Sequence, residues 1–175
     1  SQSEYNEPMQ THTDCDEKTM GNSCLLQARK VNRKVEFRAP EWAEKVSVEK
    51  LKSKNVNLFN PYENFWYMEL GGEDDSIADT EILRDKLLKV AYGIWDYIKN
   101  SGKYAADNYA FSYISPIAGK RESRRLMGDY LLTEGDILQQ KDFDDAVGHG
   151  GWSIDLHALD GFYSKELINQ HIYLK

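Results

Sequence analysis

A dense group of basic residues lies between two apolar stretches in the second half of the chain. Within residues 119–125, one lysine and three arginines follow a glycine: Gly119, Lys120, Arg121, Glu122, Ser123, Arg124 and Arg125. Arginine is permanently charged, and its planar fork of N–H groups matches a carboxylate or a phosphate. We interpret this basic loop, residues 119–125, as an anion-recognition segment that needs an anion. The alternative is an internal ion-pair cluster with Glu122, Asp129 and nearby acids, and for any single arginine both interpretations stay open.

A second group combines paired glycines with a polar pair. It comprises Gly148, His149, Gly150, Gly151, Trp152, Ser153, Ile154, Asp155, Leu156 and His157. If residues 152–157 are extended, Asp155 and His157 lie on one face, where they could bind a metal or orient each other for proton transfer. A surface strand with two outward polar side chains is the simpler interpretation. No third and fourth ligand occurs at a recognised zinc spacing, so we predict no metal site.

No recognised cofactor motif accompanies these two groups. The sequence contains no nucleophile elbow, no P-loop and no dinucleotide-binding glycine fingerprint. The pair Gly71 and Gly72 alone does not make such a fingerprint. The aromatic residues 65–67 could stack on a sugar or another ring, although core packing explains most aromatic runs. The chain therefore holds pieces of a site without a cradle for a cofactor.

Length, charge and hydrophobic content limit the kinds of fold and of partner that the chain can have. The chain has 175 residues and a net charge of −7, which argues against nucleic acid or an anionic membrane as a partner because the electrostatic term would be repulsive. A hydrophobic content of 41% is enough for a core in one domain, with or without an extended arm. No apolar run approaches the roughly 20 residues that a spanning helix needs, and the polar N-terminus is no signal peptide. We therefore predict a soluble chain without a membrane span.

The two cysteines match no metal or redox spacing. Cys15 and Cys24 lie nine positions apart near the start of the chain. Two unpaired thiols are the expected state, and a disulfide between them is the alternative.

The clearest expected element is a long amphipathic helix over residues 79–100. Its apolar residues recur at helical spacing; they are Leu83, Leu87, Val90, Ala91, Ile94, Trp95 and Ile98. Acidic residues crowd its start, Lys99 lies at its end and Gly102 follows, as expected from the helix dipole and from a C-terminal stop.

The remaining pattern predicts short elements. Strands are expected at residues 23–28, 34–37, 65–70, 109–117 and 126–132, short helices at 41–45 and 136–140, a turn at 143–147 and a sharp loop at 148–151. Residues 1–22 are predicted to form an extended or poorly ordered arm, followed by a single domain over residues 23–175. The predicted fold class is α+β, with one long amphipathic helix packed on a modest, mainly antiparallel sheet.

Several longer motifs together resemble the central portion of a family of bacterial FAD-dependent oxidoreductases. They follow one another as residues 37–43 (FRAPEWA), 66–72 (WYMELGG), 84–88 (RDKLL), 92–100 (YGIWDYIKN), 119–125 (GKRESRR), 128–133 (GDYLLT) and 150–157 (GGWSIDLH). The resemblance runs from about residue 20 to residue 157. Because several multi-residue motifs occur in one order, it is far more specific than any single motif.

Members of this family are similar in outline to fumarate-reductase-type flavoproteins, in which a substrate or cap domain interrupts a Rossmann-like FAD domain. The resemblance implies that the FAD fingerprint lies upstream of Ser1 and the closing FAD segment downstream of Lys175. The chain would then be the middle piece of a longer bacterial enzyme, cytoplasmic or periplasmic. This piece would not be expected to hold FAD or to catalyse by itself.

The resemblance also implies roles for the two groups of residues. Arg121, Arg124 and Arg125 would bind an anionic substrate group, stabilise reduced flavin or touch the FAD phosphates, with Lys120 beside them. His157 would transfer a proton, with Asp155 orienting it. The segment that contains Gly150, Gly151 and Trp152 would face the flavin ring and the substrate.

The function expected is that of a substrate-side or cap domain. It would position a small anionic or polar substrate against the flavin, and its partner would be the FAD-binding remainder of the parent chain. One alternative is a free-standing binding module that holds an acidic sugar or peptide with the basic loop and the aromatic strand. A third is a purely structural interaction domain.

Overall fold

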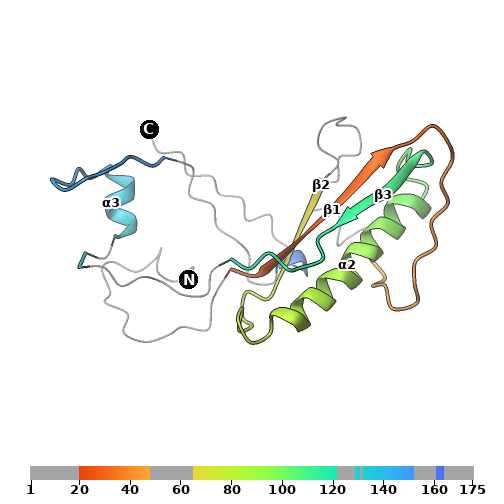
Figure 1. The fold of residues 1–175 in the computed structure, drawn as a ribbon, viewed down its shortest axis with the longest axis horizontal. Coiled ribbons are helices and arrows are strands. Elements are labelled where there is room, and N and C mark those ends of the chain that lie inside the picture. The colour runs from red at the N-terminus through yellow and green to blue at the C-terminus, as the bar shows by residue number, and fades with distance from the viewer. Residues whose placement is uncertain (1–19, 48–64, 122–128, 131, 152–160, 164–175) are drawn as a thin grey trace.

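A three-stranded antiparallel sheet with one long helix on it forms the body of the molecule (Figure 1). The computed structural model describes residues 20–47, 65–121, 129–130, 132–151 and 161–163. Structural statements below concern these residues. The observed class is α+β, as the sequence predicts.

Strand β1 (Asn22–Lys30) lies in the centre of the sheet, between β2 (Phe65–Leu70) and β3 (Tyr109–Ile114). Both neighbours run antiparallel to it, with Cys24 opposite Met68 and Leu26 opposite Ile114. The register to β3 shifts between Gln27 and Ala28. The strands predicted at 23–28, 65–70 and 109–117 are confirmed, although β3 ends at Ile114.

Alternation along β1 divides the sheet into a buried face and an open one. Cys24, Leu26 and Ala28 are at most 3% exposed, whereas Leu25 between them is 39% exposed. Successive side chains of a strand point to opposite faces. One face therefore carries the core. No α-helix of the described residues packs on the other face, which we call the helix-free face.

Helix α2 (Thr80–Asn100) covers the core face and contacts β1 and β2 (Figure 1). Its apolar stripe is buried, as predicted, and consists of Leu83, Leu87, Val90, Ala91, Ile94, Trp95 and Ile98. Lys99 Nζ donates to the carbonyl oxygens of Ala106, Asp107 and Tyr109, at 2.6, 3.2 and 3.0 Å. These bonds satisfy carbonyls in the connection from α2 to β3, so the end of the helix and the start of the strand are held together.

Two predicted elements are wrong. Residues 34–37 do not form a strand: Val35 N donates once, to Asp107 O at 2.9 Å, and Phe37 packs on the rings of Tyr92 and Trp95 instead of joining a ladder. Residues 41–45 do not form a helix: a turn bonded from Ala43 N to Pro40 O at 3.0 Å is followed by irregular chain. The chain there crosses α2 and bonds to it, with Glu44 N donating to Lys89 O at 3.0 Å. In both segments tertiary contact with α2 overrides the local pattern.

The short helix α3 (Glu134–Leu138) begins two residues earlier than predicted. Thr133 is its N-cap and exchanges hydrogen bonds with Asp136 in a capping box, so the helix must begin directly after Thr133. A turn bonded from Ala146 N to Phe143 O lies within the segment predicted to turn. Beyond it, the 3-10 helix η2 (Gly161–Tyr163) packs against β2 and buries Phe162.

Other expectations fall wholly or mostly outside the described residues. Of the arm predicted at 1–22, only residues 20–22 are described, and Asn22 already belongs to β1. Most of the strand predicted at 126–132 lies outside, as does Cys15. Cys24 is a free thiol, and burial raises its pKa. None of the described helices combines the length and the apolar character needed to cross a membrane.

Candidate functional site: the start of the basic loop

The first residue of the basic loop is tied to the end of the sheet. Ser23 N donates to Gly119 O at 2.9 Å, and Gly119 N donates to Ser23 O at 2.7 Å. A Cβ atom on Gly119 would lie 2.6 Å from Ser23 Oγ, so a larger residue here would force the Ser23 hydroxyl to move. The basic loop therefore leaves the sheet from a fixed point.

Arg121 lies against a buried acid of β2. Its Nη1 is 3.4 Å from Oε2 of Glu69, whose Oε1 accepts from Gly21 N at 3.1 Å. The Glu69 side chain is 8% exposed and that of Arg121 is 33% exposed. Arg121 thus has an acidic partner, Glu69, as the ion-pair interpretation with nearby acids expects. Its guanidinium still reaches solvent.

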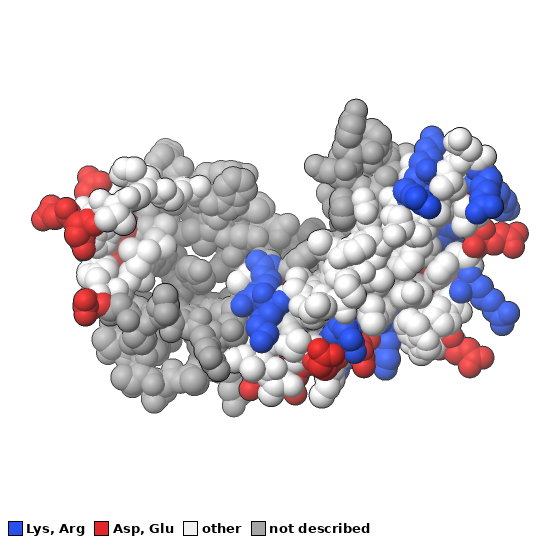
Figure 2. Space-filling view, viewed as in Figure 1, with Lys and Arg blue, Asp and Glu red and all other residues white. Residues whose placement is uncertain are grey.

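Lys120 lies near the acidic loop that precedes α2. The pKa of Asp75 is lowered chiefly because its carboxylate accepts from the backbone N–H groups of Ala78 and Ile77, and the charge of Lys120 adds to the effect. On the face shown in Figure 2, basic and acidic side chains are interspersed over the body of sheet and helix, whereas the described part around α3 shows acids. The two described cations of the basic loop, Lys120 and Arg121, therefore each lie near an acid.

Alternation places Arg121 on the helix-free face of the sheet. Met68 and Leu70 are buried in the core with their partners on β1, so Glu69 between them points the other way. On that face Leu25 and Tyr113 are 39% and 45% exposed. The start of the basic loop therefore borders an accessible surface made of polar and apolar side chains.

Two described residues of the motif at 128–133, Tyr130 and Thr133, bond to an acid of α3. Oδ2 of Asp136 accepts from Thr133 N, Thr133 Oγ1 and Tyr130 Oη at 2.8–2.9 Å, and Lys141 Nζ donates to Tyr130 Oη at 2.7 Å. These contacts, led by those from Thr133, hold the pKa of Asp136 well below its usual range. The sequence alone did not reveal the roles of Tyr130 and Lys141. The spacing of Thr133 and Asp136 was the available signal.

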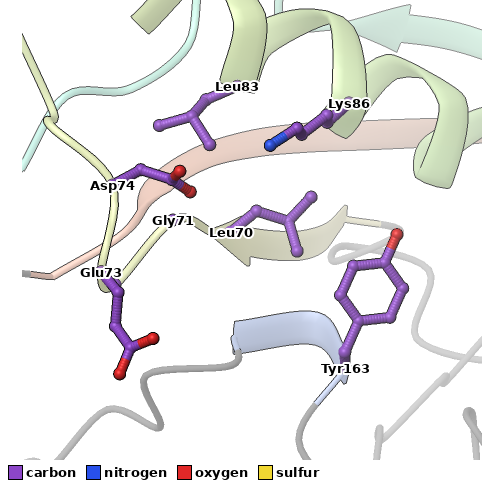
Figure 3. A pocket seen from close by; sticks show the side chains of 8 residues that line it. Leu70, Gly71, Glu73, Asp74, Leu83, Lys86 and Tyr163 are labelled. Atoms are coloured by element: carbon purple, nitrogen blue, oxygen red, sulfur yellow. The ribbon is translucent and has the colours of Figure 1, made fainter. Parts of the chain in front are cut away.

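A pocket that the sequence analysis missed lies on the other side of β2 (Figure 3). It has a volume of about 240 Å³ and is lined by Leu70, Gly71, Gly72, Glu73, Asp74, Leu83, Lys86 and Tyr163. Tyr163 Oη donates to Glu44, and its pKa is raised by burial and by that carboxylate. Because Leu70 and Glu69 point to opposite faces of β2, this pocket and Arg121 do not form one site.

The structure places only some of the predicted site residues. Gly150 and Gly151 lie in an exposed loop where an added Cβ would meet no atom within 4 Å, so no close approach explains these glycines. Five others lie outside the described residues: Arg124, Arg125, Trp152, Asp155 and His157. Within the part of the chain that is described, no three His, Cys, Asp or Glu side chains gather as a metal site would require.

The described residues do not fit the diphosphate of FAD. In dinucleotide-binding folds the phosphates lie at the N-terminus of a helix that follows a parallel strand. Here β2 leads into α2 through Gly71 and Gly72, but the sheet is antiparallel and the connection carries Glu73, Asp74 and Asp75. Gly71 has φ of 91°, and its Cβ would lie 2.7 Å from the Leu83 side chain. The glycine therefore serves the packing of α2, and the acids would repel a diphosphate.

Comparison with known proteins identifies a family. The sequence model of the family described as "FAD dependent oxidoreductase" matches residues 1–173. No curated protein and no solved structure matches the chain significantly.

Proposed function

The chain belongs to the FAD dependent oxidoreductase family, and from this premise we propose that its α+β body is the substrate-side domain of the enzyme. In this proposal the domain positions an anionic or polar small molecule against the flavin. FAD supplies the hydride acceptor, and the protein supplies binding, orientation and electrostatics. One observation carries the proposal: the basic loop starts from a fixed point on the helix-free face, with Arg121 partly exposed beside Glu69.

The chain's residues would divide the work as follows. Arg121 binds the anionic group of the substrate, and Lys120, Arg124 and Arg125 raise the local positive potential. His157 transfers the proton, and Asp155 orients its ring. Gly150, Gly151 and Trp152 shape the side of the site that faces the flavin ring and the substrate.

FAD itself would be held by the remainder of the parent chain. The antiparallel sheet and the acids before α2 support the assignment of FAD binding to the rest of the enzyme, since the described residues form no binding site for a diphosphate. The domain then meets the flavin through its helix-free face, where the surface is accessible and the basic loop begins.

A free-standing module for an acidic sugar or peptide is not favoured by any observation on the described residues. That alternative needs the aromatic side chains 65–67, whose placement is not described. Family membership supports redox chemistry instead.

The experiment that tests the proposal follows reduction of the flavin in a single turnover of the FAD-loaded enzyme. Arg121→Ala should slow flavin reduction by roughly a hundredfold, since a charged donor aimed at the substrate is lost. His157→Ala should slow it by a similar factor because proton transfer is lost.

Arg84→Ala is the matched control. The Arg84 side chain is 34% exposed, close to the 33% of Arg121, and it also pairs with acids, Glu81 and Asp85, but on the outer surface of α2. We expect the rate of the control to equal that of the wild type. Unchanged single-turnover rates in both the Arg121 and the His157 variants would contradict the proposal.

A further inference from the structure

Glu69 is a buried acid on a strand whose neighbouring residues belong to the apolar core. It lies on β2 between Met68 and Leu70, and only 7% of the residue is exposed. A buried ion pair is seldom more stabilising than apolar residues of similar volume. A carboxylate at this position therefore calls for an explanation other than stability.

The two oxygens of Glu69 hold two different parts of the chain. Oε1 accepts from Gly21 N at 3.1 Å, immediately before β1, and Oε2 faces Arg121 Nη1 at 3.4 Å. The carboxylate is thus fixed by the backbone on one side and offers its other side to the guanidinium.

Backbone hydrogen bonds near Arg121 fix the position of its main chain relative to Glu69. The reciprocal hydrogen bonds between Ser23 and Gly119 end only two residues before Arg121, and Ser23 lies opposite Glu69 in the register of β1 and β2. Arg121 is therefore restrained at its backbone through Gly119 and at its guanidinium through Glu69. A guanidinium restrained at both ends presents its fork in a fixed direction.

We infer that Glu69 is a positioning residue, which sets the direction of the Arg121 guanidinium so that the site selects a planar carboxylate over a spherical anion. The inference rests on the proposed function, in which Arg121 binds the anionic group of the substrate. A directed fork can form two parallel hydrogen bonds with a carboxylate, and a spherical ion gains nothing from the direction.

The test measures how anions protect Arg121 from phenylglyoxal, an arginine-selective reagent, in the FAD-loaded enzyme. Mass spectrometry of the peptide that contains Arg121 reports the labelling. Succinate and chloride are titrated separately as probes. In the wild type we expect succinate to protect at concentrations roughly tenfold lower than chloride.

Glu69→Gln keeps an oxygen for Gly21 N–H but removes the charge that holds the guanidinium. The preference for succinate over chloride should fall by roughly fivefold or more, because the fork loses its direction. Glu73→Gln is the matched control: it removes the same charge from an exposed position in the loop after β2 and should leave the preference unchanged. Glu69→Asp, which retains the charge, should keep most of the preference and serves as the test if the glutamine variant does not fold.

Three results would overturn the inference. If Glu69→Gln keeps the wild-type preference for succinate over chloride, as the Glu73→Gln control should, Glu69 does not set the direction of the guanidinium. If Glu69→Asp loses the preference as completely as Glu69→Gln, the carboxylate does not position the guanidinium. If succinate fails to protect Arg121 in the wild type, Arg121 does not bind a carboxylate, and the proposed function itself is contradicted together with this inference.

Discussion

At the scale of residues, the charged groups of this chain are held mainly by backbone and by one another. Lys99 is bonded to three carbonyl oxygens, Glu69 lies between a backbone N–H and Arg121, and Asp136 accepts from Thr133 and Tyr130. Sequence reasoning identified Arg121 as a candidate because arginines are dense around it. It could not identify Glu69, since the burial of that acid depends on contacts 48 and 52 positions away in the chain.

Asp136 should make the stability of α3 depend on pH. Its folded pKa lies below the ordinary value of about 3.9. A carboxyl whose pKa is depressed by folding stabilises the folded state above the ordinary pKa, and this contribution is lost as pH falls toward the folded pKa. We expect wild-type α3 to show several-fold higher amide protection than Asp136→Asn at neutral pH, and this difference to shrink below pH about 4.

The measurement is hydrogen exchange of the amides in α3, expressed as protection factors so that intrinsic pH effects cancel. Amides of α2 provide the internal control because they are remote from the capping box. A difference between wild type and variant that stays constant from neutral to acid pH would refute the role given to Asp136.

At the scale of elements, the sequence pattern predicted a helix or strand correctly where the same residues also pack in the core. The stripe from Leu83 to Ile98 predicted α2 because the same residues fill the core. The pattern failed at 34–37 and 41–45, where contacts with α2 decide the conformation. The positions of His157 and Asp155 remain predictions, so the second half of the candidate site is known only from its sequence.

Substitution of Gly93 tests how closely the segment after Pro40 packs on α2. An added Cβ would lie 2.0 Å from the carbonyl oxygen of Glu44, a backbone atom that cannot simply rotate away. Gly93→Ala should therefore lower the free energy of unfolding by roughly 1–3 kcal/mol, as overpacking does. Helix propensity alone predicts the opposite sign, a gain of about 1 kcal/mol.

Urea denaturation measures the change, and Gly135→Ala is the matched control. Gly135 lies in α3, and its added Cβ would meet atoms no closer than 3.6 Å. We expect the control to be neutral or slightly stabilising. Stabilisation by Gly93→Ala would mean that the segment around Glu44 is not packed on α2 as described.

At the scale of the whole molecule, the sheet separates two kinds of surface. One face carries α2 and the core, and the other carries Glu69, Arg121 and the accessible residues Leu25 and Tyr113. The acids between β2 and α2 repel a diphosphate, while the basic loop begins on the helix-free face. The proposed division of labour follows from this arrangement: the chain contributes substrate recognition, and the rest of the enzyme contributes the hold on FAD.

The most direct test of this division is a titration of the 175-residue chain with FAD, followed by flavin fluorescence and by co-elution in gel filtration. We predict no saturable binding, because the connection to α2 is acidic and the sheet is antiparallel. A stoichiometric yellow complex would contradict the account, since it would show that this chain holds the cofactor itself.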